Sequence, residues 1–272
     1  MSQDAYVMPI IVRARGYRLY DKTGQRYIDL YQNNGRAILG HRPPGLSQTM
    51  KSTISRGLLA EYPSIYGGRL EKILRLMFTD YSVFRMYANR ERTLEALSMV
   101  LGKRVRGSHI LDPAMTDTVD ERLMYWRPFI PEQQVKPDLL LPIFPFPGSF
   151  APHVVCVRNM DILKRMPASD LLSPFLIDAL IKTLSALIRT MHSNVGYGSE
   201  FQRLIDVLEW DRRGSYINTR LEPAVYIEVF KKALEQGVLL PPGANFPIII
   251  PREFSEGEIK GVLQFVRSVN GG

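Results

Sequence analysis

The chain has 272 residues, enough to bury a substantial core, and this length suggests one domain with a smaller appended lobe. Its hydrophobic content of 45% and charged content of 23% are those of an ordinary globular protein. The formal net charge of +8 raises the question of a polyanionic partner. Lys and Arg are, however, spread over the whole chain instead of forming a stripe interleaved with aromatic residues, which argues against nucleic-acid binding.

The cysteine content, the N-terminal residues and the histidine positions narrow the expected compartment and the kinds of site in the protein. The single cysteine, Cys156, rules out an internal disulfide framework and suits a reducing compartment. Residues 1–6 contain no basic segment followed by an apolar one, and no apolar run is long enough to span a bilayer, so we expect a cytoplasmic protein without membrane insertion. The four histidines are scattered, with no Cys or carboxylate at metal-ligand spacing, so we expect no metal site.

A β-hairpin is predicted near the N-terminus. Tyr17 and Leu19 on one side and Tyr27 and Ile28 on the other flank Asp21–Gly24, a turn signal. A glycine-punctuated loop follows and leads into a predicted helix over 46–58. Further helices are expected over 69–78 and 92–103, with a strand over 83–88 between them and another strand beginning at 109–111.

The run 139–146 contains neither the alternation of a half-exposed strand nor a polar side chain, so it is expected to be buried on both faces. Proline lacks the N–H that a ladder needs, so Pro142, Pro145 and Pro147 limit any strand here to a short one that breaks near Pro142.

Helix signals dominate the C-terminal part. Ser173 followed by Pro174 starts a helix that is expected to end near His192, and a short helix over 200–208 follows. A strand from residue 215, a helix over 222–236, strands over 238–240 and 246–250 and a last helix begun by the capping box 255–258 complete the pattern.

One stretch of about thirty residues carries a family resemblance. GYRLYDKTGQRYIDL at 16–30, continued by ILGHRP at 38–43, resembles the N-terminal signature of class III pyridoxal-phosphate (PLP) aminotransferases, the group that includes glutamate-1-semialdehyde aminomutase. The segment GVLLPP at 237–242 is similar to the small domain of the same family. Any hairpin followed by any loop is the plainer interpretation, but it does not explain why the Gly and Pro positions coincide with those of the family.

The resemblance implies an α/β fold with a reduced large domain of PLP-transferase fold type I and a C-terminal α+β small domain. The expected segments are 1–60 for the hairpin and first helix, 61–195 for the reduced large domain and 196–272 for the small domain. The large domain is reduced because only residues 112–119 separate the expected strand at 109–111 from Asp120, where the family has a long stretch with several strands.

The resemblance implies two cofactor contacts, one to the phosphate, where the residues are altered, and one to the pyridine nitrogen, where an aspartate is present. The family holds the cofactor phosphate at a strand-to-helix junction with Ser-Gly-Thr-Glu-Ala, and this chain has NRERTLE at 89–95. Arg90 and Arg92 are either side-chain donors for that phosphate or surface charges at a helix start. Asp120 lies where the family has the aspartate that pairs with the pyridine nitrogen, and it is either a vestige of that contact or a plain surface turn.

The catalytic amine is missing. Lys136-Pro-Asp-Leu resembles the family segment that leads to the Schiff-base lysine, and a match without gaps places Phe144 at that position. Transamination needs an amine that forms an imine and moves the α-proton, and phenylalanine does neither. Lys103, Lys136 and Lys164 are the possible substitutes, although nothing in their contexts indicates a desolvated amine.

Three functional hypotheses follow. The first is a degenerate class III aminotransferase-like protein that serves as a non-catalytic scaffold, either as a homodimer or as a heterodimer with an aminotransferase-like subunit. The second is an active PLP-dependent aminotransferase or aminomutase that uses a relocated lysine on an amino acid or amino ketone. The third is a basic protein that binds an anion, nucleotide or nucleic acid in the vacated cleft.

Overall fold

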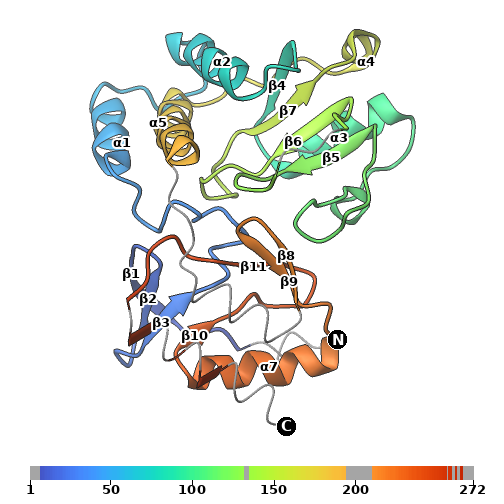
Figure 1. Cartoon of the computed structure of the whole chain (residues 1–272). Coiled ribbons are helices and arrows are strands. Elements are labelled where there is room, and N and C mark those ends of the chain that lie inside the picture. The colour runs from blue at the N-terminus through green and yellow to red at the C-terminus, as the bar shows by residue number, and fades with distance from the viewer. Residues whose placement is uncertain are drawn as a thin grey trace. The chain divides into compact units, whose positions relative to one another are not determined.

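The computed structural model describes residues 7–131, 135–193 and 210–255 together with Gly257, Glu258, Gly261, Gln264 and Phe265. The chain divides into two compact units (Figure 1). Unit 1 comprises 1–42, 129–131 and 193–272, and unit 2 comprises 43–128 and 132–192. No helix of the described residues is long and apolar enough to cross a membrane.

Unit 1 is built on the predicted hairpin. The strands β2 (Arg18–Asp21) and β3 (Arg26–Asp29) pair antiparallel, as the sequence predicts, and Asp21 closes the turn by accepting hydrogen bonds from the N–H groups of Thr23 (2.8 Å) and Gln25 (2.9 Å). The strand β1 (Ile11–Arg15) extends the sheet on one side, and β10 (Val238–Leu239) pairs parallel with β3 on the other.

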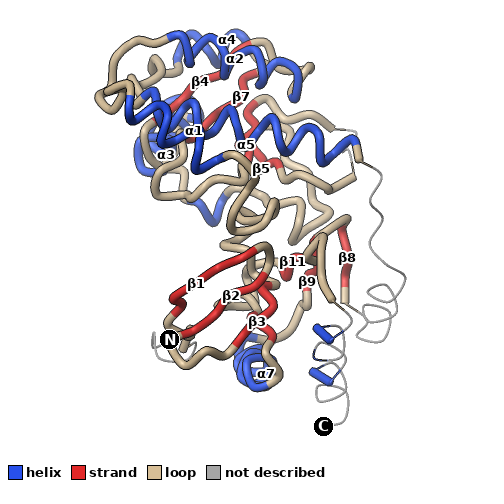
Figure 2. Tube along the Cα trace, turned by 90° about the vertical axis from the view of Figure 1, so that its left-hand side faces the viewer, coloured by secondary structure: helices blue, strands red, loops and turns tan. Residues whose placement is uncertain are grey.

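A helix and a second small sheet complete unit 1. Helix α7 (Pro223–Glu235) has proline in its first turn and is followed by Gly237 at φ 70°, a left-handed conformation that ends helices. Its buried side chains Tyr226, Val229, Phe230 and Ala233 join the core of the hairpin sheet, and Figure 2 shows α7 beside β3. The second sheet has the order β11–β9–β8, with bounds Ile248–Ile249, Tyr216–Asn218 and Asp211–Arg213.

Residues of the family-like signature have a structural role in unit 1. Asp29 is buried, and one carboxylate oxygen accepts the N–H groups of Tyr31 (2.9 Å) and Gln32 (2.8 Å). The other oxygen lies 2.7 Å from Nε2 of His41, so the carboxylate connects the end of β3 to the loop that contains Leu39-Gly40-His41. A polar group buried in this way requires its hydrogen bonds, which is why these residue types occur together in the signature.

Unit 2 contains a four-stranded sheet of order β4–β7–β6–β5. The strand β5 pairs parallel with β6, whereas β7 is antiparallel to both β4 and β6, so β4, β5 and β6 all run in one direction. The buried run is confirmed as a short strand that ends at Pro142. The bounds are Val83–Tyr87 for β4, Leu123–Trp126 for β5, Leu139–Pro142 for β6 and His153–Val157 for β7.

Helices cover this sheet and form a layer beside it. Helix α3 (Arg90–Leu101) and helix α4 (Met160–Arg165) pack on the sheet, and their apolar side chains join its core. Helices α1 (Leu46–Ser55) and α2 (Ile65–Met77) both pack against α5 (Pro174–His192), whose bounds match the predicted ones.

Four predicted or missed elements need correction. The strand expected at 109–111 is wrong: Gly107–His109 is a 3₁₀ turn, and only Leu111 forms a bridge to Met124. The strands β5 (LMYW) and β7 (HVVCV) were not predicted, because each lies between segments without a clear pattern. The helix α4, which has six residues, was not predicted either. The helix expected over 200–208 falls outside the described residues.

The compact units are not consecutive in sequence, and this differs from the expected segments 1–60, 61–195 and 196–272. Because β10 pairs with β3, the hairpin belongs to the same unit as the C-terminal lobe, whereas α1 belongs to unit 2. As a statement about domain boundaries, the three-segment division stays a prediction.

Candidate functional site

The parallel strands of unit 2 define where a site is expected. In open α/β sheets, ligands bind outside the carboxyl ends of the strands. Here β4 is followed by Ala88 and Asn89, β5 by Arg127 and β6 by Ile143 and Phe144. We call these five residues the carboxyl edge.

Phe144 is enclosed at the end of β6. The strand stops after Pro142, and Ile143 N–H donates to the carbonyl oxygen of Trp126 (2.9 Å), which holds the chain against β5. The Phe144 side chain is 2% exposed, with its ring centroid 6.3 Å from that of Phe78 and 6.4 Å from that of Trp126. Phe78 and Trp126 are themselves 5.0 Å apart, so three rings form a closed aromatic cluster.

A buried cation stands at the end of β5. The Arg127 residue is 2% exposed, and its Nε and Nη2 donate to the two carboxylate oxygens of Asp112 at 2.7 and 2.6 Å. This bidentate geometry is the strong form of an Arg–carboxylate contact. Sequence reasoning missed Arg127, although an arginine directly after the apolar run LMYW is a signal for a charge at a strand end.

Asp120 lies at the opposite edge of the sheet. It precedes β5, and its carboxylate accepts the Arg122 N–H (2.8 Å) in a local turn. The structure therefore does not bring Asp120 to the carboxyl edge, and its pairing with a cofactor ring stays a prediction.

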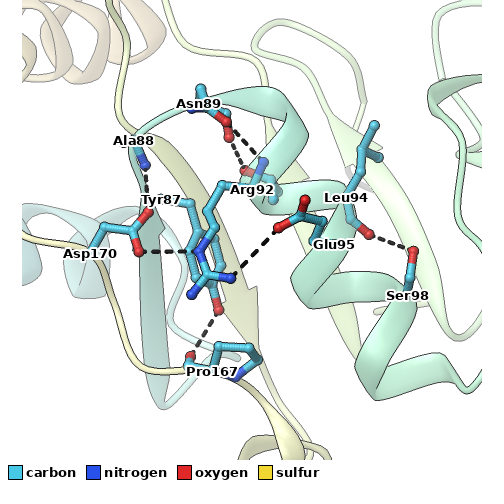
Figure 3. Close-up of polar contacts among 10 residues, drawn as sticks. Tyr87, Ala88, Asn89, Arg92, Leu94, Glu95, Ser98, Pro167 and Asp170 are labelled. Atoms are coloured by element: carbon cyan, nitrogen blue, oxygen red, sulfur yellow. Dashed lines mark hydrogen bonds and ion pairs between the residues drawn. The ribbon is translucent and has the colours of Figure 1, made fainter.

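The junction between β4 and α3 contains the predicted arginines (Figure 3). Asn89 caps the helix by accepting the Arg92 N–H (2.8 Å). The Ala88 N–H donates to Oδ2 of Asp170 (3.0 Å), and Nε of Arg92 donates to Oδ1 of the same carboxylate (3.4 Å). Glu95 lies 3.7 Å from the other side of the Arg92 guanidinium, so two carboxylates flank this cation.

Arg90 and Arg92 have different surroundings. The Arg90 guanidinium lies so close to the Cα of Gly107 that a Cβ there would overlap it. The two side chains therefore do not converge on one point. Their role as phosphate donors stays a prediction.

The candidate substitute lysines lie away from the carboxyl edge. Lys136 precedes β6, with its Nζ 3.4 Å from Asp80, and Lys164 is an exposed residue of α4 that pairs with Asp161 at 2.8 Å. Lys103 is exposed beyond the C-terminal end of α3. No lysine occurs in the sequence between Lys136 and Lys164.

Buried titratable groups near the sheet are held in their neutral forms. Burial raises the pKa of the Cys156 thiol well above its ordinary value, so the thiol is not prepared as a nucleophile. Burial also raises the pKa of Tyr87 to about 12, and its hydroxyl donates to the Pro167 carbonyl (2.9 Å). Among the described residues, no group of His, Cys, Asp and Glu is arranged to hold a metal ion.

Comparison with known sequences finds relatives of two kinds. An uncharacterized protein of Borreliella burgdorferi is 26% identical over 93% of this chain and 88% of its own length, and one of Treponema pallidum is 30% identical over 65% of this chain and 52% of its own length. A glutamate-1-semialdehyde 2,1-aminomutase of Heliobacterium modesticaldum is 34% identical over 34% of this chain, which spans only 21% of the aminomutase. No family model matches the chain.

Solved structures decide the fold. An ornithine aminotransferase from Plasmodium yoelii superposes with a TM-score of 0.73 at 15% identity over 99% of this chain and 96% of that one. The chain has the fold of the PLP-dependent aminotransferases. An omega-transaminase from Sphaerobacter thermophilus gives a TM-score of 0.69 at 12% identity, covering 99% of this chain and 93% of that one. The predicted fold class is thus confirmed.

The carboxyl edge does not fit pyridoxal phosphate, the cofactor that the resemblance implies. The resemblance implies an amine at the position of Phe144, a carboxylate for the ring nitrogen and free donors for the phosphate. The described residues supply instead the phenyl ring of Phe144, the guanidinium of Arg127 and a junction whose Ala88 N–H already binds Asp170. None of these is a primary amine.

Proposed function

We propose that this aminotransferase-like protein is non-catalytic, does not form a lysine–PLP Schiff base, and acts in the cytoplasm as a dimeric scaffold or as the partner of an aminotransferase-like subunit. The observation that carries the proposal is the buried position of Phe144. Its ring is 2% exposed and packed between Phe78 and Trp126, so the position that the resemblance assigns to the amine is apolar core. A lysine in place of Phe144 would lose these ring contacts and leave its amine in a site from which water is excluded.

The charge at the end of β5 supports the same proposal. A carboxylate beside the pyridine nitrogen keeps it protonated, and a guanidinium would disfavour that proton. The Arg127 guanidinium is fully buried and bound to Asp112, which makes it part of the fold instead of a ligand group.

A direct test mixes the purified protein with PLP, records the absorption spectrum, and treats the mixture with borohydride before peptide mass spectrometry. We expect no internal-aldimine band and no peptide with a reduced lysine adduct. An intact class III aminotransferase serves as the positive control. A stoichiometric adduct on Lys103, Lys136 or Lys164 together with an internal-aldimine band would instead support an enzyme with a relocated lysine, and the matching Lys→Arg variant should then lose both the band and the adduct.

A partner surface is supported by exposed apolar side chains in the segment from the end of α1 to the first residue of α2. Leu59, Tyr62 and Ile65 are 51, 72 and 65% exposed. Large apolar groups that gather in one short stretch are typical of protein contacts. We expect light scattering to give a dimer mass for the wild type and a lower mass for Tyr62→Asp. Met99→Asp, which alters a 65% exposed residue of α3, is the control that should leave the mass unchanged.

The salt concentration at which the protein elutes from a polyanion column tests the third hypothesis, an anion or nucleic-acid binder. A protein that binds polyanions through many phosphate contacts stays on a polyanion column until the salt is high. We expect elution at modest salt, because the basic residues are spread over the chain.

A further inference from the structure

The segment that follows α4 is fixed along the free edge of β4. The Met86 N–H donates to Oγ of Ser169 (3.1 Å), and the Asp170 N–H donates to the carbonyl oxygen of Met86 (2.9 Å). The Tyr87 hydroxyl holds the same segment through Pro167 (2.9 Å). Because the Pro167 carbonyl, the Ser169 hydroxyl and the Asp170 N–H are all held by β4, the Asp170 side chain has a defined place.

That place is the β4–α3 junction. One carboxylate oxygen of Asp170 accepts the Ala88 N–H (3.0 Å) and the other accepts Nε of Arg92 (3.4 Å), as Figure 3 shows. A backbone N–H, the N-terminus of a helix of 12 residues and a guanidinium are together the donors with which proteins hold an oxyanion. A carboxylate of the chain itself, that of Asp170, is therefore bound to two of these donors, the Ala88 N–H and the Arg92 guanidinium.

The Arg92 N–H and the Thr93 hydroxyl at the start of α3 are engaged as well. Asn89 accepts the Arg92 N–H (2.8 Å), and the Thr93 hydroxyl donates to the Asn89 carbonyl (2.8 Å). Glu95 adds a second carboxylate 3.7 Å from the guanidinium. A phosphate that entered this junction would meet two negative charges at a few ångströms, where like charges repel.

We propose that Asp170 is a built-in substitute for a bound phosphate and closes the β4–α3 junction to phosphate esters. The inference concerns the anion site only. It is independent of the proposed lack of a Schiff base, because an imine and a phosphate contact involve different atoms and different residues. A trapped lysine adduct would overturn the proposed function and leave this inference standing, whereas phosphate binding at the junction would do the reverse.

The test titrates the full-length chain with inorganic phosphate at constant ionic strength and follows the ³¹P line width by NMR. Wild type is compared with Asp170→Ser, which removes the charge and shortens the side chain, and with Asp170→Asn, which removes the charge and keeps the shape. Asp161→Ser is the matched control, because Asp161 is an exposed carboxylate of α4 in the same unit that pairs only locally with Lys164. Circular dichroism checks that each variant is folded.

We expect wild type and Asp161→Ser to bind phosphate equally weakly and Asp170→Ser to bind it at least about tenfold more tightly, the effect of one charge-assisted hydrogen bond. Asp170→Asn should gain less, because its amide oxygen still accepts the Ala88 N–H. Adding Arg92→Gln to Asp170→Ser should abolish the gain. If Asp170→Ser unfolds in chloride, refolding upon addition of phosphate supports the proposal.

Three results would overturn it. The first is wild-type binding as tight as that of Asp170→Ser. The second is a folded Asp170→Ser variant with no gain over Asp161→Ser. The third is an unfolded variant that phosphate does not restore.

Discussion

The end of β6 and the β4–α3 junction differ in how they are filled. At the end of β6, Phe144 is buried and packed against two other rings, those of Phe78 and Trp126. At the junction, Asp170 and Arg92 fill the space with an ion pair that is partly exposed, since their side chains are 24 and 39% accessible. The comparison teaches that a buried apolar side chain such as Phe144 contributes to the stability of the fold. The ion pair at the junction differs, because without the Asp170 carboxylate the Ala88 N–H and the Arg92 guanidinium would remain as donors.

Phe144→Ala is expected to have the largest effect on stability. Truncating a buried phenylalanine removes its transfer free energy and leaves a cavity, which costs about 3–5 kcal/mol. Phe150→Ala is the matched control, because Phe150 lies six residues further along and is 60% exposed, and surface changes stay within about 0.5 kcal/mol. Urea unfolding measures both. Equal losses would mean that the aromatic cluster is not part of the core.

Arg127→Met tests the buried ion pair of Arg127 and Asp112 at the carboxyl edge. Removing the guanidinium leaves the Asp112 carboxylate without its bidentate donor, and we expect a loss of about 3 kcal/mol. Arg158→Met is the control: its partner Asp138 is 3.6 Å away and its side chain is 44% exposed, so about 0–1 kcal/mol is expected. The double variant Arg127→Met/Asp112→Asn should recover about 1 kcal/mol or more of the loss. A double variant that loses the sum of both single effects would contradict a coupled pair.

The ion pair between Arg18 and Glu258 in unit 1 extends the comparison to pH. Burial raises the pKa of Glu258, but hydrogen bonds from Arg18 and Ser255 outweigh it, so the pKa lies below its usual 4.5. A lowered carboxylate pKa stabilises the fold above the unfolded value, and this contribution is lost as the pH falls through the folded value. Glu258→Gln should therefore cost about 1.5–3 kcal/mol near neutral pH.

Below about pH 4.5 the difference in unfolding free energy between Glu258→Gln and wild type should shrink. Glu228→Gln, at an exposed glutamate of α7 that pairs with Lys231, is the control and should show no such pH dependence. A difference that stays constant between neutral and acid pH would show that the pair is not electrostatic in origin.

The sequence supports the fold much better than the site. The hairpin, the buried strand ending at Pro142 and helix α5 follow from turn residues, proline and apolar spacing, which are local signals. The match without gaps gave Phe144 the Schiff-base position, and the structure places this residue just after β6. Asp120 and Arg127 show the limit. Which of them reaches the carboxyl edge depends on where β5 begins, and a strand of four residues gives too little pattern to locate its ends.

Asp170 shows a second limit. It lies 78 residues from Arg92 in sequence, and its role comes from backbone hydrogen bonds between the segment around Ser169 and the free edge of β4. No spacing rule relates such positions, so a sequence without aligned relatives does not predict the contact. Arg90 and Arg92 lie in the first turn of α3, and which partners they meet is a property of the tertiary structure.

Tyr87→Phe is the smallest expected effect and tests whether the segment around Asp170 is held as a unit. The change removes the hydroxyl that donates to Pro167, for a loss of about 1 kcal/mol. Tyr81→Phe is the matched control, because Tyr81 donates to the Pro137 carbonyl at 3.0 Å elsewhere in the same unit. Both variants should lose similar stability. Only Tyr87→Phe should speed amide hydrogen exchange at Ala88 and Asp170, because only there does the lost bond release the segment that carries the carboxylate. Equal exchange in the two variants would mean that Asp170 keeps its place without help from Tyr87.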